Sequence, residues 1–208
     1  MKKASIIIST IVILLFCSFS SSFGQSRDIF KESGIIKITS LSFFNGFDEI
    51  AYGSHLIDNY QTSISIHQVI GNMFNPYFSL GFGIGFEKWK YTSFVPIYAD
   101  FRFNLYSGRY SPHIYTDLGY ATKWYQSPKP ESKNQVFNGA TQGLYAETGI
   151  GFKVMVSSSA STIFTFSYKL QETSINYSDE YNLFPQITTN RAERVLYHFL
   201  GGKIAYQF

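Results

Sequence analysis

Apolar and polar side chains alternate one by one along residues 95–105, and this alternation constrains the fold more than any other feature of the sequence. Successive side chains of a β-strand point to opposite faces, whereas an α-helix repeats every 3.6 residues. The segment is therefore predicted to be a strand with one apolar and one polar face. The apolar face carries Val95, Ile97, Ala99, Phe101, Phe103 and Leu105, and the polar face carries Pro96, Tyr98, Asp100, Arg102 and Asn104.

Seven further segments share this pattern, although residues 35–44 do not reveal which of their faces is which. A tilted strand needs about 9–11 residues to cross a bilayer, and bacterial single-chain barrels have an even number of strands. The sequence thus predicts an all-β fold, an eight-stranded antiparallel up-and-down transmembrane β-barrel. The seven segments are residues 35–44, 62–71, 78–86, 113–124, 144–154, 162–170 and 195–208.

The composition agrees with a sheet. Aromatic residues make up 19% of the chain and charged residues only 15%, an unusual balance for a soluble protein. Aromatic side chains fit the pleated surface of a sheet. With 17 Lys and Arg against 14 Asp and Glu, the charge gives no indication of nucleic-acid binding.

The first residues are typical of a secretory signal. Lys2 and Lys3 precede an apolar stretch, residues 6–19, and Ser22-Phe23-Gly24 places small residues where a signal peptidase cuts. We predict a signal peptide at residues 1–24, with Gln25 beginning a barrel domain at 25–208. The single cysteine, Cys17, falls inside the signal, so the mature chain is expected to have no disulfide or thiolate chemistry.

The connections between the expected strands alternate in length. Outer-membrane barrels have short periplasmic turns and longer external loops. The pattern predicts both termini on the periplasmic side and polar, solvated external loops that could meet an external ligand or protein. The longer connections are 45–61, 125–142 and 172–193, with a shorter one at 88–93, and the short turns are 72–76, 106–112 and 156–160.

Alternation alone does not say which face points inward, because a soluble lipocalin-like barrel places its apolar face inside. The membrane arrangement is favoured by the loop lengths and by Tyr, Gly and charges of both signs on the polar faces. Aromatic residues near strand ends are then expected to form girdles at the two membrane interfaces. The expected girdle residues are Tyr77, Trp89, Tyr106, Trp124, Tyr206 and Phe208.

In the membrane arrangement the polar faces line the interior. An eight-stranded barrel is just wide enough for side chains to fill it, and buried charges need partners. We therefore predict a plugged, polar lumen in which Arg102 and Asp117 are neighbours. The expected network comprises Glu87, Asp100, Arg102, His113, Asp117, Lys123, Glu147, Lys153, Lys169 and Lys203.

No recognisable catalytic constellation is present in the sequence. The His-x-Ser pair of lipid A deacylases, the Asp-Ser dipeptide of the acyltransferase type and the HExxH metal motif are all absent. His113 with Asp117 on the same face comes nearest to a base and its orienting acid, and a hydrogen-bonded lumen histidine is the favoured interpretation. No enzyme activity, cofactor or metal is predicted.

Three segments resemble a known family, the small outer-membrane β-barrel proteins of Bacteroidota type, relatives of the OmpA/OmpX-like eight-stranded barrels. They are residues 75–86 (NPYFSLGFGIGF), 95–102 (VPIYADFR) and 111–120 (SPHIYTDLGY). The resemblance implies an exported protein of a Gram-negative-type outer membrane, with outer-membrane lipids as partners. It also implies folding by the insertion machinery that reads a terminal aromatic strand.

The expected function is structural or surface-interacting, without enzyme activity. Three alternatives stay open at this point: a narrow small-solute channel, a lipid-modifying outer-membrane enzyme, and a soluble lipocalin-like periplasmic binding barrel. Conductance in planar bilayers separates the first of these from a plugged barrel.

Overall fold

The computed structural model describes residues 33–52, 55–59, 61–89, 92–126, 135–181 and 187–208, and consists there of β-strands and their connections. The predicted signal peptide, residues 1–24, lies outside the described residues. The strands are β1 (Gly34–Phe47), β2 (Glu49–Tyr52), β3 (His55–Asp58), β4 (Thr62–Asn75), β5 (Phe78–Lys88), β6 (Thr92–Asn104), β7 (Tyr110–Gln126), β8 (Gln135–Ala140), β9 (Gly143–Met155), β10 (Ser161–Tyr181) and β11 (Ile187–Gln207).

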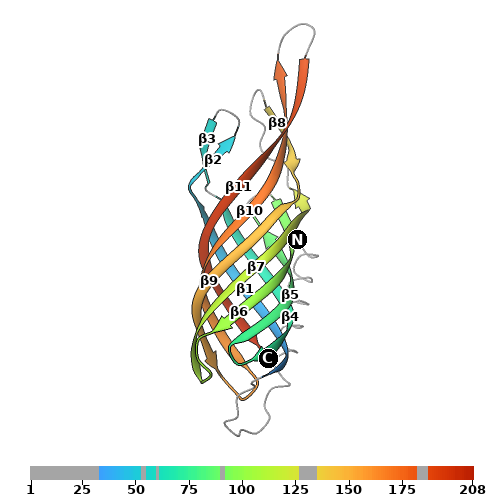
Figure 1. Ribbon diagram of the computed structural model, residues 1–208. Helices are drawn as coiled ribbons and strands as arrows, with labels where there is room; N and C mark the ends of the chain where they lie inside the picture. Colours follow the sequence, from blue (N-terminus) through green and yellow to red (C-terminus); the bar gives the residue numbers. More distant parts are fainter. Residues whose placement is uncertain (1–32, 53–54, 60, 90–91, 127–134, 182–186) are drawn as a thin grey trace, which may run out of the picture.

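Eight of the described strands close into a ring, so the predicted eight-stranded antiparallel barrel is confirmed (Figure 1). Their order is β1-β4-β5-β6-β7-β9-β10-β11, each antiparallel to the next, and β11 pairs back onto β1. Following paired residues once around the ring from Gln207 through Ile38 returns to β11 at Tyr197, ten positions earlier. For eight strands, this shear corresponds to a strand tilt of about 40°.

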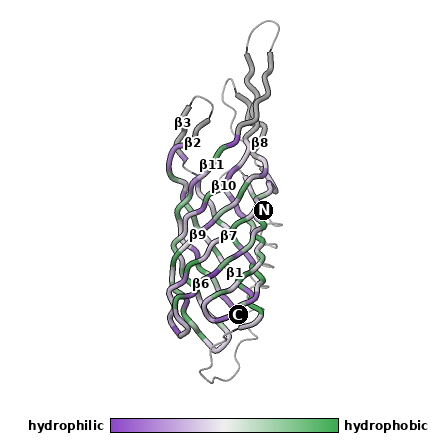
Figure 2. The backbone as a smooth tube through the Cα atoms, in the orientation of Figure 1, coloured by the Kyte–Doolittle hydropathy of each residue, from purple (hydrophilic) through white to green (hydrophobic). Residues whose placement is uncertain are grey.

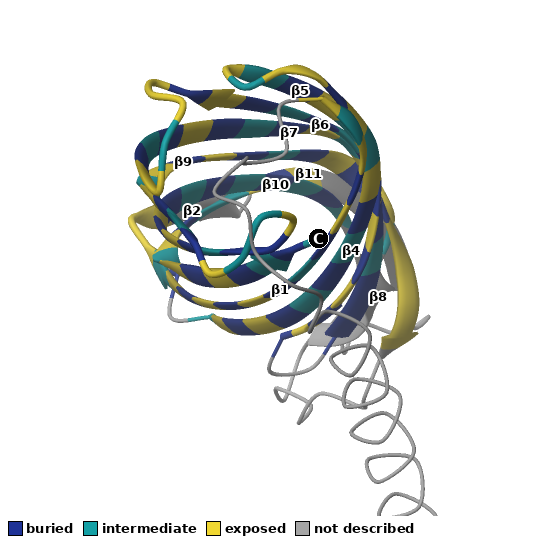
Figure 3. Ribbon diagram, turned by 90° about the horizontal axis from the view of Figure 1, so that it is seen from below, coloured by how far each residue is buried: buried dark blue, intermediate teal, exposed yellow. Residues whose placement is uncertain are grey.

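Side chains alternate between the two faces of the wall, as Figure 3 shows by the bands of buried and exposed residues along each strand. In Figure 2 the wall alternates between hydrophilic and hydrophobic residues in the same way. Large apolar side chains face outward, among them Leu41, Phe82, Ile150 and Phe166, each at least 59% exposed. The outside of the barrel is therefore apolar, which is the reverse of a soluble lipocalin-like barrel.

The first strand, whose facing the alternation left open, is now placed. Its inward side chains are Ile36, Ile38, Ser40, Ser42 and Phe44. Ile36 and Ile38 pack in the interior with Val69 and Met73 of β4, toward the end of the barrel where β4 turns into β5. These four side chains form an apolar cluster at this end of the interior, where Arg102, His113 and Lys153 are also buried.

The two ends of the barrel differ in their connections. At one end the turns are short. Between β4 and β5 the side-chain oxygen of Asn75 accepts hydrogen bonds from the backbone amides of Tyr77 and Phe78. Between β9 and β10 the backbone amide of Val156 donates to the backbone oxygen of Ala160. The C-terminus lies at this end (Figure 1). Among the described residues, no helix is long and apolar enough to cross a membrane.

At the other end the connections expected to be loops are largely β-structure, which corrects that expectation. Residues 45–61 contain the β2–β3 hairpin, and residues 125–142 contain β8, which pairs with β10. Within 172–193, β10 runs on to Tyr181 and β11 begins at Ile187, so both strands have 21 residues. These elements project beyond the barrel (Figure 1).

Candidate functional site: the barrel interior

The interior of the barrel holds nine of the ten side chains expected to line the lumen. Each is at most 7% exposed, and they come from β5, β6, β7, β9, β10 and β11 because each lies on the inward face of its strand. Apart from histidine, the described interior carries four acidic and four basic side chains, so its formal charges balance. The nine are Glu87, Asp100, Arg102, His113, Asp117, Glu147, Lys153, Lys169 and Lys203.

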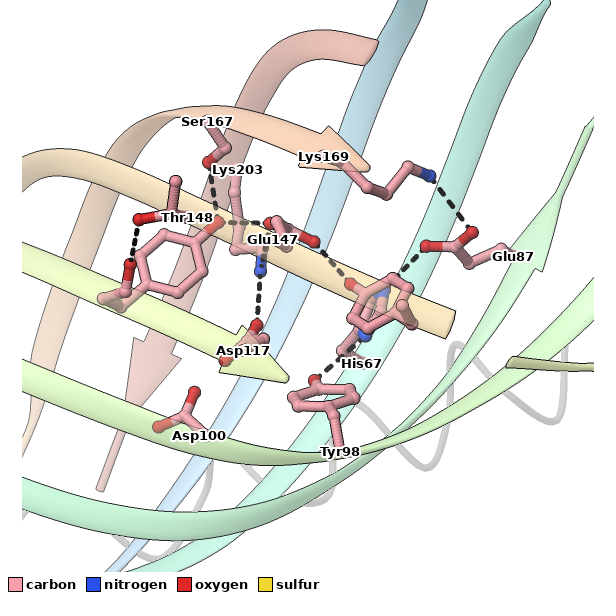
Figure 4. Close-up of polar contacts among 12 residues, drawn as sticks. His67, Glu87, Tyr98, Asp100, Asp117, Glu147, Thr148, Ser167, Lys169 and Lys203 are labelled. Carbon is pink, nitrogen blue, oxygen red and sulfur yellow. Dashed lines mark hydrogen bonds and ion pairs between the residues drawn. The ribbon is translucent and has the colours of Figure 1, made fainter. Parts of the chain in front are cut away.

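Lys203 lies at the centre of this network (Figure 4). Its Nζ is 2.6 Å from Oε1 of Glu147 and 3.4 Å from Oδ2 of Asp117, and it lies 4.3 Å from the centroid of the Tyr115 ring. The hydroxyl of Tyr115 donates to Glu147, and that of Tyr145 donates to the second oxygen of the same carboxylate at 2.5 Å. The ammonium and the two hydroxyl groups offset the cost of removing this carboxylate from water.

Arg102 pairs within its own strand. Its Nε lies 2.7 Å from Oδ1 of Asp100, and its Nη2 lies 2.8 Å from Oδ2, a bidentate contact. Asp117 faces Asp100 across the β6–β7 pair and binds Lys203 instead. Arg102 and Asp117 are therefore both in the lumen, but the ion pair of Arg102 is with Asp100.

Another ion pair lies further from the short turns. The Lys169 Nζ is 3.0 Å from Oε2 of Glu87 and donates to Oγ of Ser63 at 3.0 Å, and both charged side chains are fully buried. The same ammonium lies 4.5 Å from the ring centroid of Phe199 and 4.8 Å from that of Phe44. Aromatic ring faces attract a desolvated cation, so Lys169 is held by one carboxylate and by the rings around it.

Trp89, expected in an outer girdle, lies inside the barrel, 5% exposed. Its ring centroid is 4.7 Å from that of Phe94 and 5.0 Å from those of Tyr197 and Phe199, and its Nε1 donates to Oε2 of Glu87 at 3.3 Å. The prediction is wrong because Trp89 follows Glu87 by two residues, and the alternation continues past the last residue of β5. Trp89, Phe94, Tyr197 and Phe199, which we call the aromatic cap, cover the Lys169–Glu87 pair.

Lys123, expected in the lumen, is exposed, which corrects that prediction. The pairing of β6 with β7 shifts at this point: Phe94 pairs with Lys123, and Ser93 pairs with Tyr125. An extra residue in one strand disrupts the alternation locally. Phe94 of β6, the residue that pairs with Lys123, is buried in the interior, and Lys123 of β7 is exposed on the outside of the wall.

The remaining girdle residues lie on the outside of the barrel. Tyr77 and Tyr106 are exposed beside the short turns, and Trp124 is 73% exposed at the opposite end of β7. Tyr206 and Phe208 are half-buried on the outward face of the last strand, with ring centroids 5.9 Å apart. Both ends of the outer wall therefore carry aromatic side chains.

His113 does not form a base–acid pair with Asp117. Its Nδ1 lies 3.2 Å from Oδ1 of Asn104, and its ring stacks 6.0 Å from that of Tyr115. Within the part of the chain that the structure describes, no group of three or more His, Cys, Asp and Glu side chains could hold a metal ion.

Several interior residues outside the expected set complete the network. His67 accepts or donates a 3.0 Å hydrogen bond at Nδ1 with the Tyr98 hydroxyl, and its Nε2 lies 3.7 Å from Oε1 of Glu87 (Figure 4). Tyr98, Tyr115 and Tyr145 share strands and faces with the predicted charged residues. The alternation places these tyrosines on the polar faces, although the expected network named only charged side chains and His113.

Some buried polar atoms of the interior have no hydrogen-bond partner among the described residues. Ser42 Oγ and Ser65 Oγ are two of them, on paired positions of β1 and β4, and Ser65 in turn pairs with Glu87, whose Oε1 is also unpartnered. His67 Nε2 belongs to the same group. Buried polar groups of this kind usually bind ordered water.

No protein-family model matches the chain, and no curated protein matches it in sequence. Solved structures do match its fold. The outer membrane protein OprG from Pseudomonas aeruginosa superposes with a TM-score of 0.57 at 11% identity, over 88% of this chain and 99% of that chain. The chain shares its fold with an outer-membrane β-barrel protein.

Two further similarities are lower. The outer membrane protein AlkL, solved in lipid bilayers, matches at 11% identity with a TM-score of 0.49, over 91% of this chain and 97% of that one. Neisserial surface protein A matches at 10% identity with a TM-score of 0.45, over 84% and 98%.

Proposed function

We propose that this protein is a plugged, non-enzymatic β-barrel of the bacterial outer membrane, which holds a projecting strand structure at the cell surface for contact with an external ligand or protein. The observation that carries the proposal is the interior. The Lys169–Glu87 ion pair joins the opposite strands β10 and β5 under the aromatic cap, and Lys203 of β11 pairs with Asp117 of β7 and Glu147 of β9. The interior of an eight-stranded barrel is just wide enough for side chains to fill, so these side chains leave no open channel.

The outer wall supports a place in a membrane. Its exposed side chains are largely Leu, Ile, Phe and Tyr, and the buried charges point inward. In lipid every backbone polar group must be bonded internally, and the closed ring of strands fulfils that condition. The similarity of fold to OprG agrees with this placement.

The projecting structure supports a role at the surface. β10 and β11 stay paired along their whole length, from Ser161 opposite Gln207 at the short-turn end to Tyr181 opposite Ile187. β8 pairs with the outer part of β10, from Ala140 opposite Ile175 to Gln135 opposite Asp179. With the short turns and the C-terminus on the periplasmic side, these strands stand on the outer side (Figure 1). Surface loops and hairpins on a rigid barrel are where such proteins carry binding residues.

Conductance in planar bilayers tests the plug. The purified full-length chain is expected to give no discrete current steps in 1 M KCl, whereas a wide porin reconstituted in the same way gives them. Steps with the wild-type chain would refute the plugged barrel. Replacing two rings of the aromatic cap, with Phe94→Ala and Phe199→Ala together, is the variant expected to raise the current.

A shortened β10–β11 hairpin tests the surface role. Deleting residues 176–191 and joining the strands by a Gly-Asn turn leaves the barrel and its interior contacts intact. Cells that carry the shortened chain are expected to lose the attachment to surfaces, or the aggregation with other cells, that the full chain restores to a deletion strain. Equal attachment and aggregation with the two chains would refute a role of the hairpin. In a separate experiment, altered lipid A in cells that overexpress the full chain would favour an enzyme instead.

A narrow permeation route is the second candidate, and the unpartnered atoms of Ser42, Ser65, His67 and Glu87 favour it. Water held there would make part of the interior hydrated. Small current steps from the wild-type chain that disappear when Ser65 is replaced by valine would support this candidate over the plugged barrel.

A further inference from the structure

Two lysines are exposed on the outer wall formed by β5, β6 and β7, and both lie toward the end of the barrel opposite the short turns. They are Lys88 on β5 and Lys123 on β7. Within the described residues of these three strands, the outward wall therefore carries positive charge and no acidic side chain. The other charged side chains of the three strands are buried in the interior: Glu87, Asp100, Arg102 and Asp117.

The register shift between β6 and β7 turns Lys123 outward. Ser93 of β6 pairs with Tyr125 of β7. The next residue of β6, Phe94, pairs with Lys123, which leaves Trp124 as an extra residue in β7. Lys123, Trp124 and Tyr125 are all exposed, although successive residues of a regular strand face opposite sides. The irregularity thus brings a cation and two aromatic side chains together on the outside of the barrel.

Lys88 lies beside this group. It pairs with Ser93, and Ser93 pairs with Tyr125, so the three residues form one row across the wall. The Lys88 Nζ lies 5.8 Å from the centroid of the Tyr125 ring, so the side chain extends toward the strand that carries Lys123. Neighbouring strands are about 4.8 Å apart, which separates the backbones of the two lysines by about 10–12 Å. Two extended lysine side chains with an anion between them span such a distance.

The height of these lysines on the barrel matches the edge of an apolar layer. Lys37, an exposed lysine toward the short-turn end of β1, pairs with Ile70, which pairs with Phe82 of β5. Lys88 follows Phe82 on β5, and at a strand tilt of about 40° it lies about 20 Å from Lys37 along the barrel axis. The apolar band of outer-membrane barrels is about 25 Å tall. In the proposed membrane placement, on which this inference rests, Lys88 and Lys123 lie at the level of the outer headgroups.

We propose that Lys88 and Lys123 form a binding site for a lipid phosphate, and that its occupant is lipid A, the phosphorylated glycolipid of the outer leaflet. A phosphate monoester carries a charge of about −1.5 to −2, which two ammonium groups balance, whereas the diester of a phospholipid carries a single negative charge. Trp124 and Tyr125 lie beside the site, and aromatic rings suit the headgroup level. The acyl chains of the same lipid then lie against the apolar wall.

The opposite side of the barrel differs in charge. Arg194 of β11 is exposed there, but its Nη1 lies 3.6 Å from Oε1 of Glu172 on β10, so the two outward charges compensate each other. Lys88 and Lys123 have no acidic partner among the described residues. A phosphate therefore completes the charge balance on the β5–β7 side, where the protein itself supplies no anion.

Lipid retention by the purified full-length barrel tests the proposal. The probes are diphosphoryl lipid A and the same lipid after removal of both phosphates, added to the protein in detergent and measured by native mass spectrometry. Lys88→Gln together with Lys123→Gln is expected to weaken the binding of diphosphoryl lipid A at least about tenfold. Arginine at both positions is expected to keep the binding, and the matched control Lys37→Gln, which removes an exposed lysine at the other end, is expected to leave it unchanged.

Equal binding of the two lipids by wild type, or wild-type binding by the double glutamine variant, would overturn the proposal. Equal retention of phosphatidylglycerol would overturn the assignment to lipid A. A membrane-impermeant maleimide tests the placement separately: it is expected to label Lys123→Cys on intact cells and Lys37→Cys only after lysis, and the reverse pattern would refute the outer position of the site. A heat-dependent shift in gel mobility shows that each variant is a folded barrel, so failure of lipid binding and failure of the membrane placement are distinguishable.

Discussion

Replacing Lys169 by methionine tests how much the interior ion pairs contribute to stability. The substitution keeps most of the side-chain volume and removes the ammonium that lies 3.0 Å from Glu87 and within 5 Å of two aromatic ring centroids. Glu87 would then be a buried carboxylate without its cation. Removing one partner of a buried pair costs about 3–5 kcal/mol, so Lys169→Met is expected to lower the free energy of unfolding by about 4 kcal/mol.

A second substitution separates the ion pair from the packing. Glu87→Gln on the Lys169→Met background removes the unpaired charge, and the double variant is expected to recover to within about 1 kcal/mol of wild type. The coupling energy of the cycle, which also includes the loss in the single variant Glu87→Gln, is then at least about 3 kcal/mol. Equilibrium unfolding in urea with phospholipid vesicles measures all four chains, and the fluorescence of Trp89, which bonds to Glu87, reports on the site.

The exposed pair of Arg194 and Glu172 is the matched control. Its atoms are 3.6 Å apart and the Arg194 side chain is 82% exposed, so Arg194→Met is expected to cost less than about 1 kcal/mol. If Lys169→Met also costs less than about 1 kcal/mol, or if the second substitution adds to the loss, the ion pair does not stabilise the barrel and the reasoning is refuted.

Two further substitutions probe the wall and the network. Gly119→Val is expected to prevent barrel closure or to cost more than about 3 kcal/mol, because a Cβ there would lie 2.0 Å from the backbone oxygen of Ile97. Gly108→Val, with open space around it, is expected to have little effect. The recovery of heat-modifiable barrel after refolding measures both variants. Tyr145→Phe removes the 2.5 Å hydrogen bond to the buried Glu147 carboxylate and is expected to cost about 2 kcal/mol in the same urea titration, a value near zero being incompatible with the bond.

The alternation of side chains was sufficient to predict the eight strands and the facing of most residues, since a strand in a barrel wall has one lipid-like and one interior face. It failed where the local geometry departs from it. Lys123 lies next to a register shift that no single-sequence pattern reveals. Trp89 contradicts the expectation that an aromatic residue at a strand end marks a membrane interface, whereas its even spacing from Glu87 indicates the interior.

The choice of ion-pair partners lies beyond what the sequence can predict. Arg102 lies close to both Asp100 and Asp117, and the distances that decide between them depend on tilt and rotamer. The β10–β11 extension differs from the expected loop for another reason. Its polar residues, Asn and Ser above all, are typical of loops, but Ile, Tyr and Thr in the same segment favour strands.

The position of Lys203 has a consequence for how the barrel assembles. It belongs to the last strand, and it supplies the cation for both Asp117 and Glu147, which come from β7 and β9. A sheet that lacks β11 would have two open edges and two interior carboxylates without a counter-ion. Arrival of the final strand therefore seals the wall and neutralises the interior in one event, so partly assembled intermediates gain little stability before the chain closes on itself.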